Sequence, residues 1–225
     1  MKKLFLFDID GTLVKGYGDD RFTTTISNIH QLDIKSEKDF RGSTDQLILV
    51  DLLRTEGWGD KQIKEAMPKL LKELDKVHEE TFNMDRLKLL PGVKKLLETL
   101  DDQENTLGLI TGNLKSIAQR KLKALGIWSH FSVGGFGSDP HTTRSDLVRH
   151  AVKQAGFKDH IEGVYVIGDT PRDIIAAKEA GITNSVGVAN GFRSTQELID
   201  AGAKIVFKDF TDTQEVLKVL GIVAR

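Results

Sequence analysis

The fold is decided by the stretch Leu4-Phe5-Leu6-Phe7-Asp8-Ile9-Asp10-Gly11-Thr12 near the start of the chain. Its first four residues are apolar without alternation, which is typical of a strand buried on both faces in a parallel sheet. The carboxylates of Asp8 and Asp10 follow where this strand ends, and open α/β sheets bind ligands at that edge. An ordinary Asp-Gly turn would explain the same residues without any function. The remaining motifs must decide between the two interpretations.

Apolar runs of the same kind recur along the chain and predict strands at 107–110, 164–167, 185–188 and 205–207. A weaker strand candidate at 131–133 precedes what reads as a Gly134-Gly135 turn. Helical periodicity separates these runs, and helix ends are marked by Thr170 as an N-cap and by Gly126, Gly156 and Gly181 as C-caps. This alternation predicts an α/β fold, a doubly wound parallel sheet with a Rossmann-like core.

The segment from residue 15 to residue 90 has a different pattern. It contains no convincing strand, and its apolar residues recur at helical spacing around Leu52 and Leu70. We interpret it as an all-helical domain inserted after the first strand. The expected division is therefore a catalytic core of residues 1–14 and 91–225 and a helical cap domain of residues 15–90.

Composition excludes several classes of function. The 225 residues carry 32 Lys plus Arg against 33 Asp plus Glu, a formal net charge of -1, which gives no reason to expect binding to nucleic acid or an acidic membrane. The absence of Cys excludes disulfides, thiolate catalysis and Cys-ligated zinc. No stretch has the roughly 18 apolar residues of a membrane span, and the N-terminal apolar run is too short for a signal peptide. We expect a cytoplasmic protein, monomeric or homodimeric.

Two further motifs follow predicted strands. Thr111-Gly112-Asn113 leads into a helix, and a hydroxyl, a flexible glycine and a helix N-terminus together suit phosphate oxygens, although an N-cap would explain the motif equally well. Gly168-Asp169 is followed by Asp173 in the first turn of a helix. Asp173 alone could simply complement the helix dipole, whereas Asp169 has no such local explanation.

Together the three motifs resemble those of the haloacid dehalogenase superfamily, in its phosphatase branch with a helical cap of the first type, as in phosphoglycolate phosphatases and beta-phosphoglucomutases. The resemblance implies that Asp8 attacks phosphorus and forms an aspartyl-phosphate, while Asp10 donates and later accepts the proton. It implies a Mg2+ ion held by Asp8, the Asp10 carbonyl oxygen and Asp169, with Thr12 and Asp173 supporting this shell. Thr111, Gly112 and Asn113 would bind the phosphoryl oxygens.

One departure from the superfamily pattern concerns the positive charge. The superfamily usually places a Lys at the start of a helix ahead of the last motif, but residues 138–147 contain no Lys. Arg144 is the candidate substitute, because it keeps the charge and offers a guanidinium that matches phosphate; the alternative is a solvated Arg at a helix start. The loop with Gly42 and Thr44 resembles the cap loop that reads the leaving group, with a helix N-cap as the equally plausible alternative.

The sequence therefore predicts a magnesium-dependent phosphohydrolase that acts on a small phosphorylated metabolite. A phosphomutase of the beta-phosphoglucomutase kind and a pyrophosphatase are alternatives within the same chemistry. A hydrolytic dehalogenase is a weaker alternative, because it would leave Asp10 and Asp169 without a purpose. A non-enzymatic phospho-acceptor module would leave the helical insertion unexplained.

Overall fold

The computed structural model describes residues 2–15, 20–32, 34, 39–103, 105–139, 143–190 and 193–222. At its centre is a parallel sheet with the strand order β3-β2-β1-β4-β5-β6. The strands are β1 (Leu4–Phe7), β2 (Thr106–Thr111), β3 (Val133–Phe136), β4 (Val164–Gly168), β5 (Asn184–Val188) and β6 (Ile205–Phe207). All four residues of β1 are fully buried, as expected for a strand covered on both faces.

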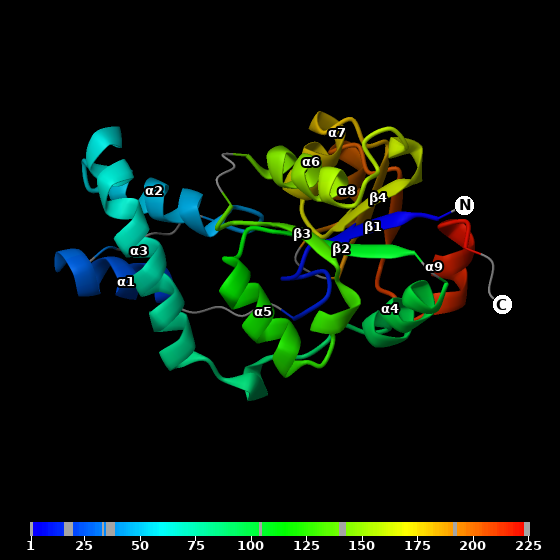
Figure 1. Ribbon diagram of the computed structural model, residues 1–225, viewed down its shortest axis with the longest axis horizontal. Helices are drawn as coiled ribbons and strands as arrows, with labels where there is room; N and C mark the ends of the chain where they lie inside the picture. Colours follow the sequence, from blue (N-terminus) through cyan, green and yellow to red (C-terminus); the bar gives the residue numbers. More distant parts are fainter. Residues whose placement is uncertain are drawn as a thin grey trace.

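Helices cover both faces of this sheet (Figure 1). One face carries α4 (Val93–Asp102), α5 (Lys115–Ala124) and α9 (Thr213–Val219), and the other carries α6 (Arg144–Gln154), α7 (Pro171–Glu179) and α8 (Thr195–Asp200). Short 3-10 helices lie at Trp128–His130 and Ile161–Gly163. Each face has its own apolar cluster, the first around Leu96 and Leu122, the second around Val148 and Ala177. The predicted fold class, a doubly wound α/β sheet, is confirmed.

Five predicted strands are present with ends that differ by two residues or fewer, but the sixth prediction is wrong. The 131–133 candidate is replaced by β3, which runs through Gly134 and Gly135 instead of ending before them. A Cβ on Gly135 would lie 2.4 Å from the carbonyl oxygen of Leu147, so the glycine lets α6 pack closely on the edge strand. The N–H of Gly134 donates to Gln154 Oε1. These glycines serve close packing and form no turn.

The predicted helix ends are confirmed. Gly126, Gly156 and Gly181 follow α5, α6 and α7 with φ of 71°, 75° and 82°, values that glycine adopts readily. Thr170 is the N-cap of α7 and Pro171 is its first residue.

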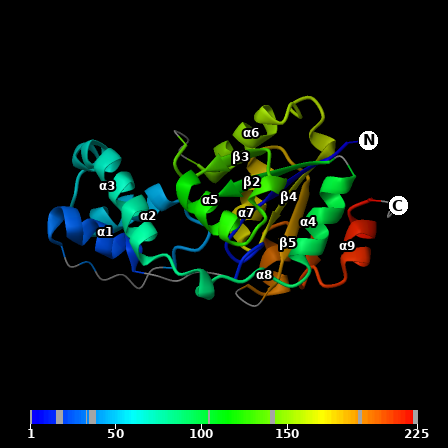
Figure 2. The same cartoon turned by 60° about the horizontal axis from the view of Figure 1, so that its bottom comes forward.

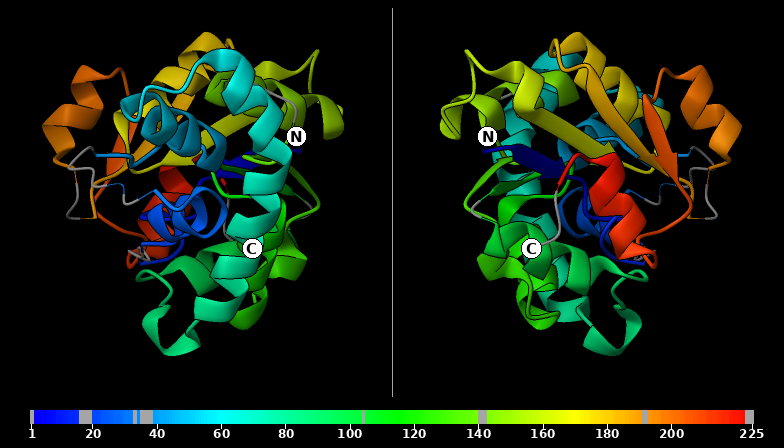
Figure 3. Two further views of the ribbon diagram at one scale, coloured as in Figure 1. Left: turned by 90° about the vertical axis from the view of Figure 1, so that its left-hand side faces the viewer. Right: turned by 90° about the vertical axis from the view of Figure 1, so that its right-hand side faces the viewer.

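A helical segment lies at one end of the sheet and α9 at the opposite end (Figure 1). We define this segment as α1 (Arg21–His30), α2 (Asp45–Thr55) and α3 (Asp60–Thr81), which a 3-10 helix at Met84–Arg86 follows. Figure 2 shows the three helices grouped together, and in the left view of Figure 3 α3 passes in front of the sheet. Their apolar side chains form a third cluster that also takes in Leu114 and Ile117 near α5.

The described residues of this segment form helices and no strand, in agreement with the predicted helical insertion. Residues 16–19, 33 and 35–38 of the predicted insertion lie outside the described part of the chain. The exact division at residues 15 and 90, and the cap function of the segment, remain predictions. None of the helices in the described part of the chain has the length and apolarity needed to cross a membrane.

Candidate active site

Three aspartates meet at the carboxyl ends of β1 and β4. Phe7 and Ile167 are paired across these neighbouring strands, so the residues that follow them, Asp8 and then Asp169, emerge side by side. Asp173 reaches the same place from the first turn of α7. All three are buried, and a carboxylate oxygen from each lies within 4.8 Å of the others. The sheet topology changes direction beside β1, which is where open α/β sheets place ligands.

Burial, reinforced by repulsion between neighbouring carboxylates, shifts the pKa of two of these carboxyls upward. Burial, only partly offset by Arg144, raises the pKa of Asp8 to about 7, and Asp173 and Asp10 add to the rise. Burial raises the pKa of Asp169 to about 8, with repulsion from Asp173 and Asp8 in the same direction. Buried carboxylates in this arrangement need a cation to be ionised together. An all-oxygen donor set of this kind fits Mg2+, a hard cation.

Arg144 lies inside this cluster and is only 8% exposed. Its Nη2 is 2.8 Å from Asp8 Oδ1 and 2.5 Å from Asp173 Oδ1, and its Nε donates to Asp173 Oδ1 at 2.7 Å. Nη1 donates to the carbonyl oxygen of Gly42, in the loop before α2, at 3.3 Å. The guanidinium therefore links the proposed nucleophile, a second acid and the helical segment. A lysine has a single side-chain nitrogen and could not make these contacts in the same geometry.

Asp173 has its oxygens engaged by the protein. Besides Arg144, it accepts hydrogen bonds from the backbone N–H and the hydroxyl of Thr170, at 3.1 and 2.7 Å, in a capping box at the start of α7. Within the described part of the chain, Asp169 accepts one side-chain hydrogen bond, from Thr12 Oγ1 at 3.4 Å. A metal ligand needs available lone pairs, so Asp169 suits that place better than Asp173.

Gly11 permits the close approach of Asp169. Its φ is +87°, and a Cβ at this position would lie 2.1 Å from Asp169 Oδ2. A side chain here would thus occupy the position of a carboxylate that the site needs. Thr12 and Gly11 together hold the loop after β1 against the loop after β4.

The Asp10 side chain is bound by Lys121 of α5 and by Asn113. Its two oxygens lie 2.8 and 2.9 Å from the Nζ of Lys121, and Oδ2 also accepts from the Asn113 amide at 2.6 Å. Burial alone would raise the pKa of Asp10, but the charge and hydrogen bonds of Lys121 and the bond from Asn113 hold it below its ordinary value. The Asp10 side chain remains 33% exposed, whereas that of Asp8 is 7% exposed.

The loop after β2 brings the predicted phosphate-binding residues together. Thr111 and Asn113 are buried, and the Thr111 hydroxyl accepts hydrogen bonds from the backbone N–H and the side-chain amide of Asn113. A Cβ on Gly112 would lie 2.1 Å from the carbonyl oxygen of Ser43. The glycine therefore allows the loop before α2 to rest on this loop.

Gly42 and Thr44 lie in that adjoining loop. The Thr44 hydroxyl accepts from the N–H of Leu47, so Thr44 is the N-cap of α2, the alternative considered for it. Gly42 has φ of +75° and adjoins Thr170 and Arg172 at the start of α7. Both residues therefore lie beside the cluster, and a role in binding substrate remains a prediction for them.

Three buried charged residues near the site escaped prediction. Lys121 lies on α5 among apolar neighbours and is fully buried. The available signal was a lysine at a helix position whose neighbours at helical spacing, Ile117 and Leu125, are apolar. Arg21 and Asp45, which form a buried pair at 3.3 Å inside the helical segment, had no comparable pattern in the sequence.

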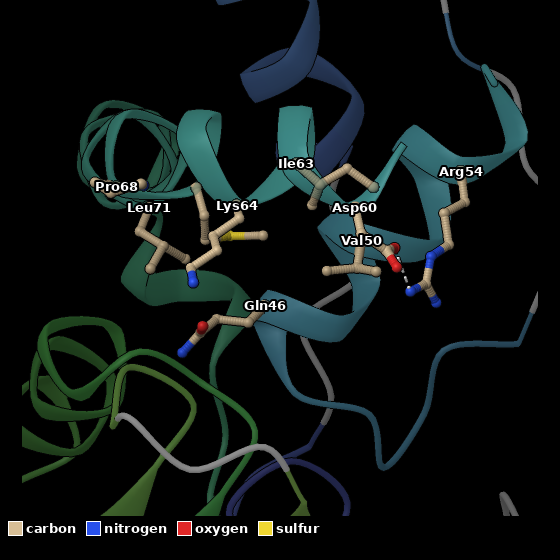
Figure 4. Close-up of a pocket in the computed structure, with 9 residues that line it drawn as sticks. Gln46, Val50, Arg54, Asp60, Ile63, Lys64, Pro68 and Leu71 are labelled. Carbon is tan, nitrogen blue, oxygen red and sulfur yellow. Dashed lines mark hydrogen bonds and ion pairs between the residues drawn. The ribbon is translucent and has the colours of Figure 1, made fainter. Parts of the chain in front are cut away.

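The largest hollow among those described does not lie at the aspartates. It has a volume of about 550 Å³ and lies between α2 and α3, with Val50, Ile63 and Leu71 on its walls and the Arg54–Asp60 ion pair at its rim (Figure 4). None of the predicted site residues lines it. A smaller hollow of about 390 Å³ adjoins Arg144, Gly42 and Thr44 and therefore borders the site.

Comparisons with known proteins agree with the motifs. The family model for haloacid dehalogenase-like hydrolases matches residues 5–188. The phosphoglycolate phosphatase of Mannheimia succiniciproducens is 27% identical over 231 residues, covering 96% of this chain and 98% of the relative. The phosphorylated carbohydrates phosphatase of Thermotoga maritima is 27% identical over 159 residues, 71% of each chain.

Solved structures show the same architecture. A hydrolase from Pseudomonas syringae superposes with a TM-score of 0.73 at 26% identity, covering 97% of this chain and 99% of the other. A beta-phosphoglucomutase from Clostridium difficile has a TM-score of 0.70 at 18% identity, covering 98% of each, a likeness of fold alone. The α/β sheet, with acids at the carboxyl ends of its strands, thus has the architecture of a solved hydrolase. The chain belongs to the haloacid dehalogenase-like hydrolases, in their phosphatase branch, and the predicted resemblance is confirmed.

Proposed function

We propose that this protein is a magnesium-dependent phosphohydrolase that cleaves a small phosphorylated metabolite through an aspartyl-phosphate on Asp8. The observation that carries the proposal is the convergence of Asp8, Asp169 and Asp173 within 4.8 Å, with the Arg144 guanidinium among them. The phosphatases among the relatives supply the class of reaction.

In the first step, an oxygen of Asp8 attacks phosphorus, the bond from phosphorus to the leaving oxygen breaks, and Asp10 gives that oxygen its proton. In the second step, water attacks the aspartyl-phosphate and gives a proton to Asp10, phosphate leaves, and Asp8 is restored. Arg144 offsets the charge that gathers on the phosphoryl oxygens, and Thr111 and Asn113 offer them a hydroxyl and amide donors.

Mg2+ would be held by Asp8 and Asp169, with the Asp10 carbonyl oxygen as the third protein ligand. When bound, it neutralises the phosphoryl group and the crowded carboxylates. Asp173 and Thr12 would keep Arg144 and Asp169 in place. The helical segment, whose loop rests on the phosphate-binding loop, would exclude water from the first step.

The direct test is turnover of p-nitrophenyl phosphate and of a panel of small phosphorylated metabolites, with magnesium and with EDTA. We expect the wild type to release phosphate only with magnesium, and Asp8→Asn to be inactive although folded, because an amide cannot serve as the nucleophile. Asp85→Asn, an exposed acid in the 3-10 helix at Met84–Arg86, is the matched control and should keep full activity. Substantial turnover by Asp8→Asn would refute the covalent mechanism.

A further inference from the structure

Lys121 is a second buried cation of the site that the proposed mechanism has not used. Its side chain is 1% exposed, and its Nζ is within 3.3 Å of three acceptors: both oxygens of Asp10 and the Oδ1 of Asn113. An ammonium has three N–H donors and no acceptor, so these contacts use its full capacity. Burying an ammonium group costs free energy unless it is paired. The pair with Asp10 therefore explains why a lysine is buried at position 121.

The two cations of the site serve different acids. Arg144 contacts Asp8 and Asp173 in the metal cluster, whereas Lys121 and Asn113 bind Asp10. Lys121 Nζ contacts both oxygens of Asp10, and the Asn113 amide donates to Oδ2, so these bonds fix the orientation of the Asp10 carboxyl group. A fixed orientation of Asp10 is what the second step requires, since a general base must lie within hydrogen-bond reach of the water that it activates.

We propose that Lys121 is a positioning residue for the water-activating step: it holds the Asp10 carboxylate, by both oxygens, as the base that hydrolyses the aspartyl-phosphate. The proposal rests on the proposed function and assigns Lys121 to one half of it. Asp10 is also accessible enough for this task, since a third of its side-chain surface is open. The contacts of the Lys121 ammonium are with Asp10 and Asn113, so we expect it to act through the position of Asp10.

The experiment separates the two steps with 2,4-dinitrophenyl phosphate, whose phenolate leaves without needing a proton. Rapid mixing of Lys121→Met with this substrate and magnesium should give a burst of phenolate close to one per enzyme molecule. The following steady-state rate should fall roughly 10- to 100-fold relative to wild type, the effect of losing a hydrogen bond to a charged group. Acid quenching should recover the variant with phosphate on Asp8.

The matched control is Lys123→Met, which removes an exposed lysine from the same helix and should change neither phase by more than about twofold. Lys121→Arg keeps a cation and should recover part of the steady-state rate. A purely structural role would lower the burst and the steady rate together, because fewer molecules would be competent.

A lowered or unchanged steady-state rate without a burst would overturn this inference, as would a failure of Lys121→Met and of Lys121→Gln to reach the folded circular dichroism spectrum. Neither result would contradict the proposed function as long as wild-type turnover depends on Asp8. Conversely, turnover by Asp8→Asn would remove the aspartyl-phosphate itself and with it the proposed function.

Discussion

Asp8 and Asp10 are two residues apart in one loop, and their environments differ in nearly every respect. Asp8 is enclosed with two other carboxylates around Arg144, and burial raises its pKa to about 7. Asp10 is more open, and Lys121 and Asn113 overcome the effect of burial and hold its pKa below the ordinary value. The surroundings of the two acids thus differ: Asp8 belongs to a cluster in which one cation, Arg144, faces three carboxylates, and Asp10 forms a pair with Lys121.

The largest expected effects on turnover come from replacing Asp8 and Asp10, and their sizes should differ. Asp8→Asn should lower turnover by roughly 10^4-fold or more, since a nucleophile is removed, whereas Asp10→Asn should cost about 10^2- to 10^4-fold because only proton transfer is lost. With 2,4-dinitrophenyl phosphate, Asp10→Asn should still give a phenolate burst and Asp8→Asn none. Rapid-quench kinetics would measure both. A burst from Asp8→Asn would show that Asp8 is not the nucleophile.

Replacing Arg144 should lower kcat less than replacing the nucleophile Asp8 does, but more than replacing a surface cation does. Arg144→Ala is expected to lower kcat about 10^2- to 10^3-fold, the usual cost of one donor to a developing charge, and Arg144→Lys to retain part of the rate. Arg149→Ala, which removes a half-exposed guanidinium one turn further along α6, is the control and should stay within about twofold. Steady-state kinetics would decide, and an unchanged kcat in Arg144→Ala would remove Arg144 from the site.

Magnesium should have a smaller, pH-dependent effect on stability. The pKa values of Asp8 and Asp169, about 7 and about 8, lie above the ordinary 3.8, so without metal their contribution to stability is present at low pH and is lost as pH rises through these values. The metal-free Tm should therefore fall between pH 6 and pH 8.5. Magnesium, for which protons compete, should restore about 2.7 kcal/mol at one hundred times its Kd at pH 8.5 and less at pH 6.

Differential scanning calorimetry at the two pH values would measure this shift. Asp169→Asn should lose the response to magnesium, and Asp85→Asn should keep it. An equal rise of Tm at both pH values would show that magnesium binds elsewhere.

The sequence predicted most of the fold because its signals were local. Buried strands such as 164–167 were visible as apolar runs, and Gly126 and Gly181 marked helix ends through the conformation that glycine alone adopts without strain. The edge strand β3 was mispredicted because its two glycines suggested a turn. Only the approach of α6 to within a few ångströms shows why glycine is needed there.

The site residues that could be predicted from the sequence are those that lie at the ends of strands. Asp8, Thr111 and Asp169 stand at strand ends, where sequence position implies location. Lys121 was not found, because its partner Asp10 is 111 positions away and its helix reads as an ordinary amphipathic one. Pairings of this kind depend on how α5 packs under the sheet, which no local pattern encodes.

The packing of the loop before α2 on the loop after β2 bears on how such proteins could be redesigned. Asp45 is the first residue of α2, yet its N–H donates to the Gly112 carbonyl and its Oδ2 accepts from the N–H of Leu114, so α2 is hydrogen-bonded to the loop after β2. A segment transplanted from a relative must therefore bring its own acceptor for the Leu114 N–H. If α1–α3 select the substrate as predicted, we expect substitutions of their side chains to preserve this loop better than an exchange of the whole segment.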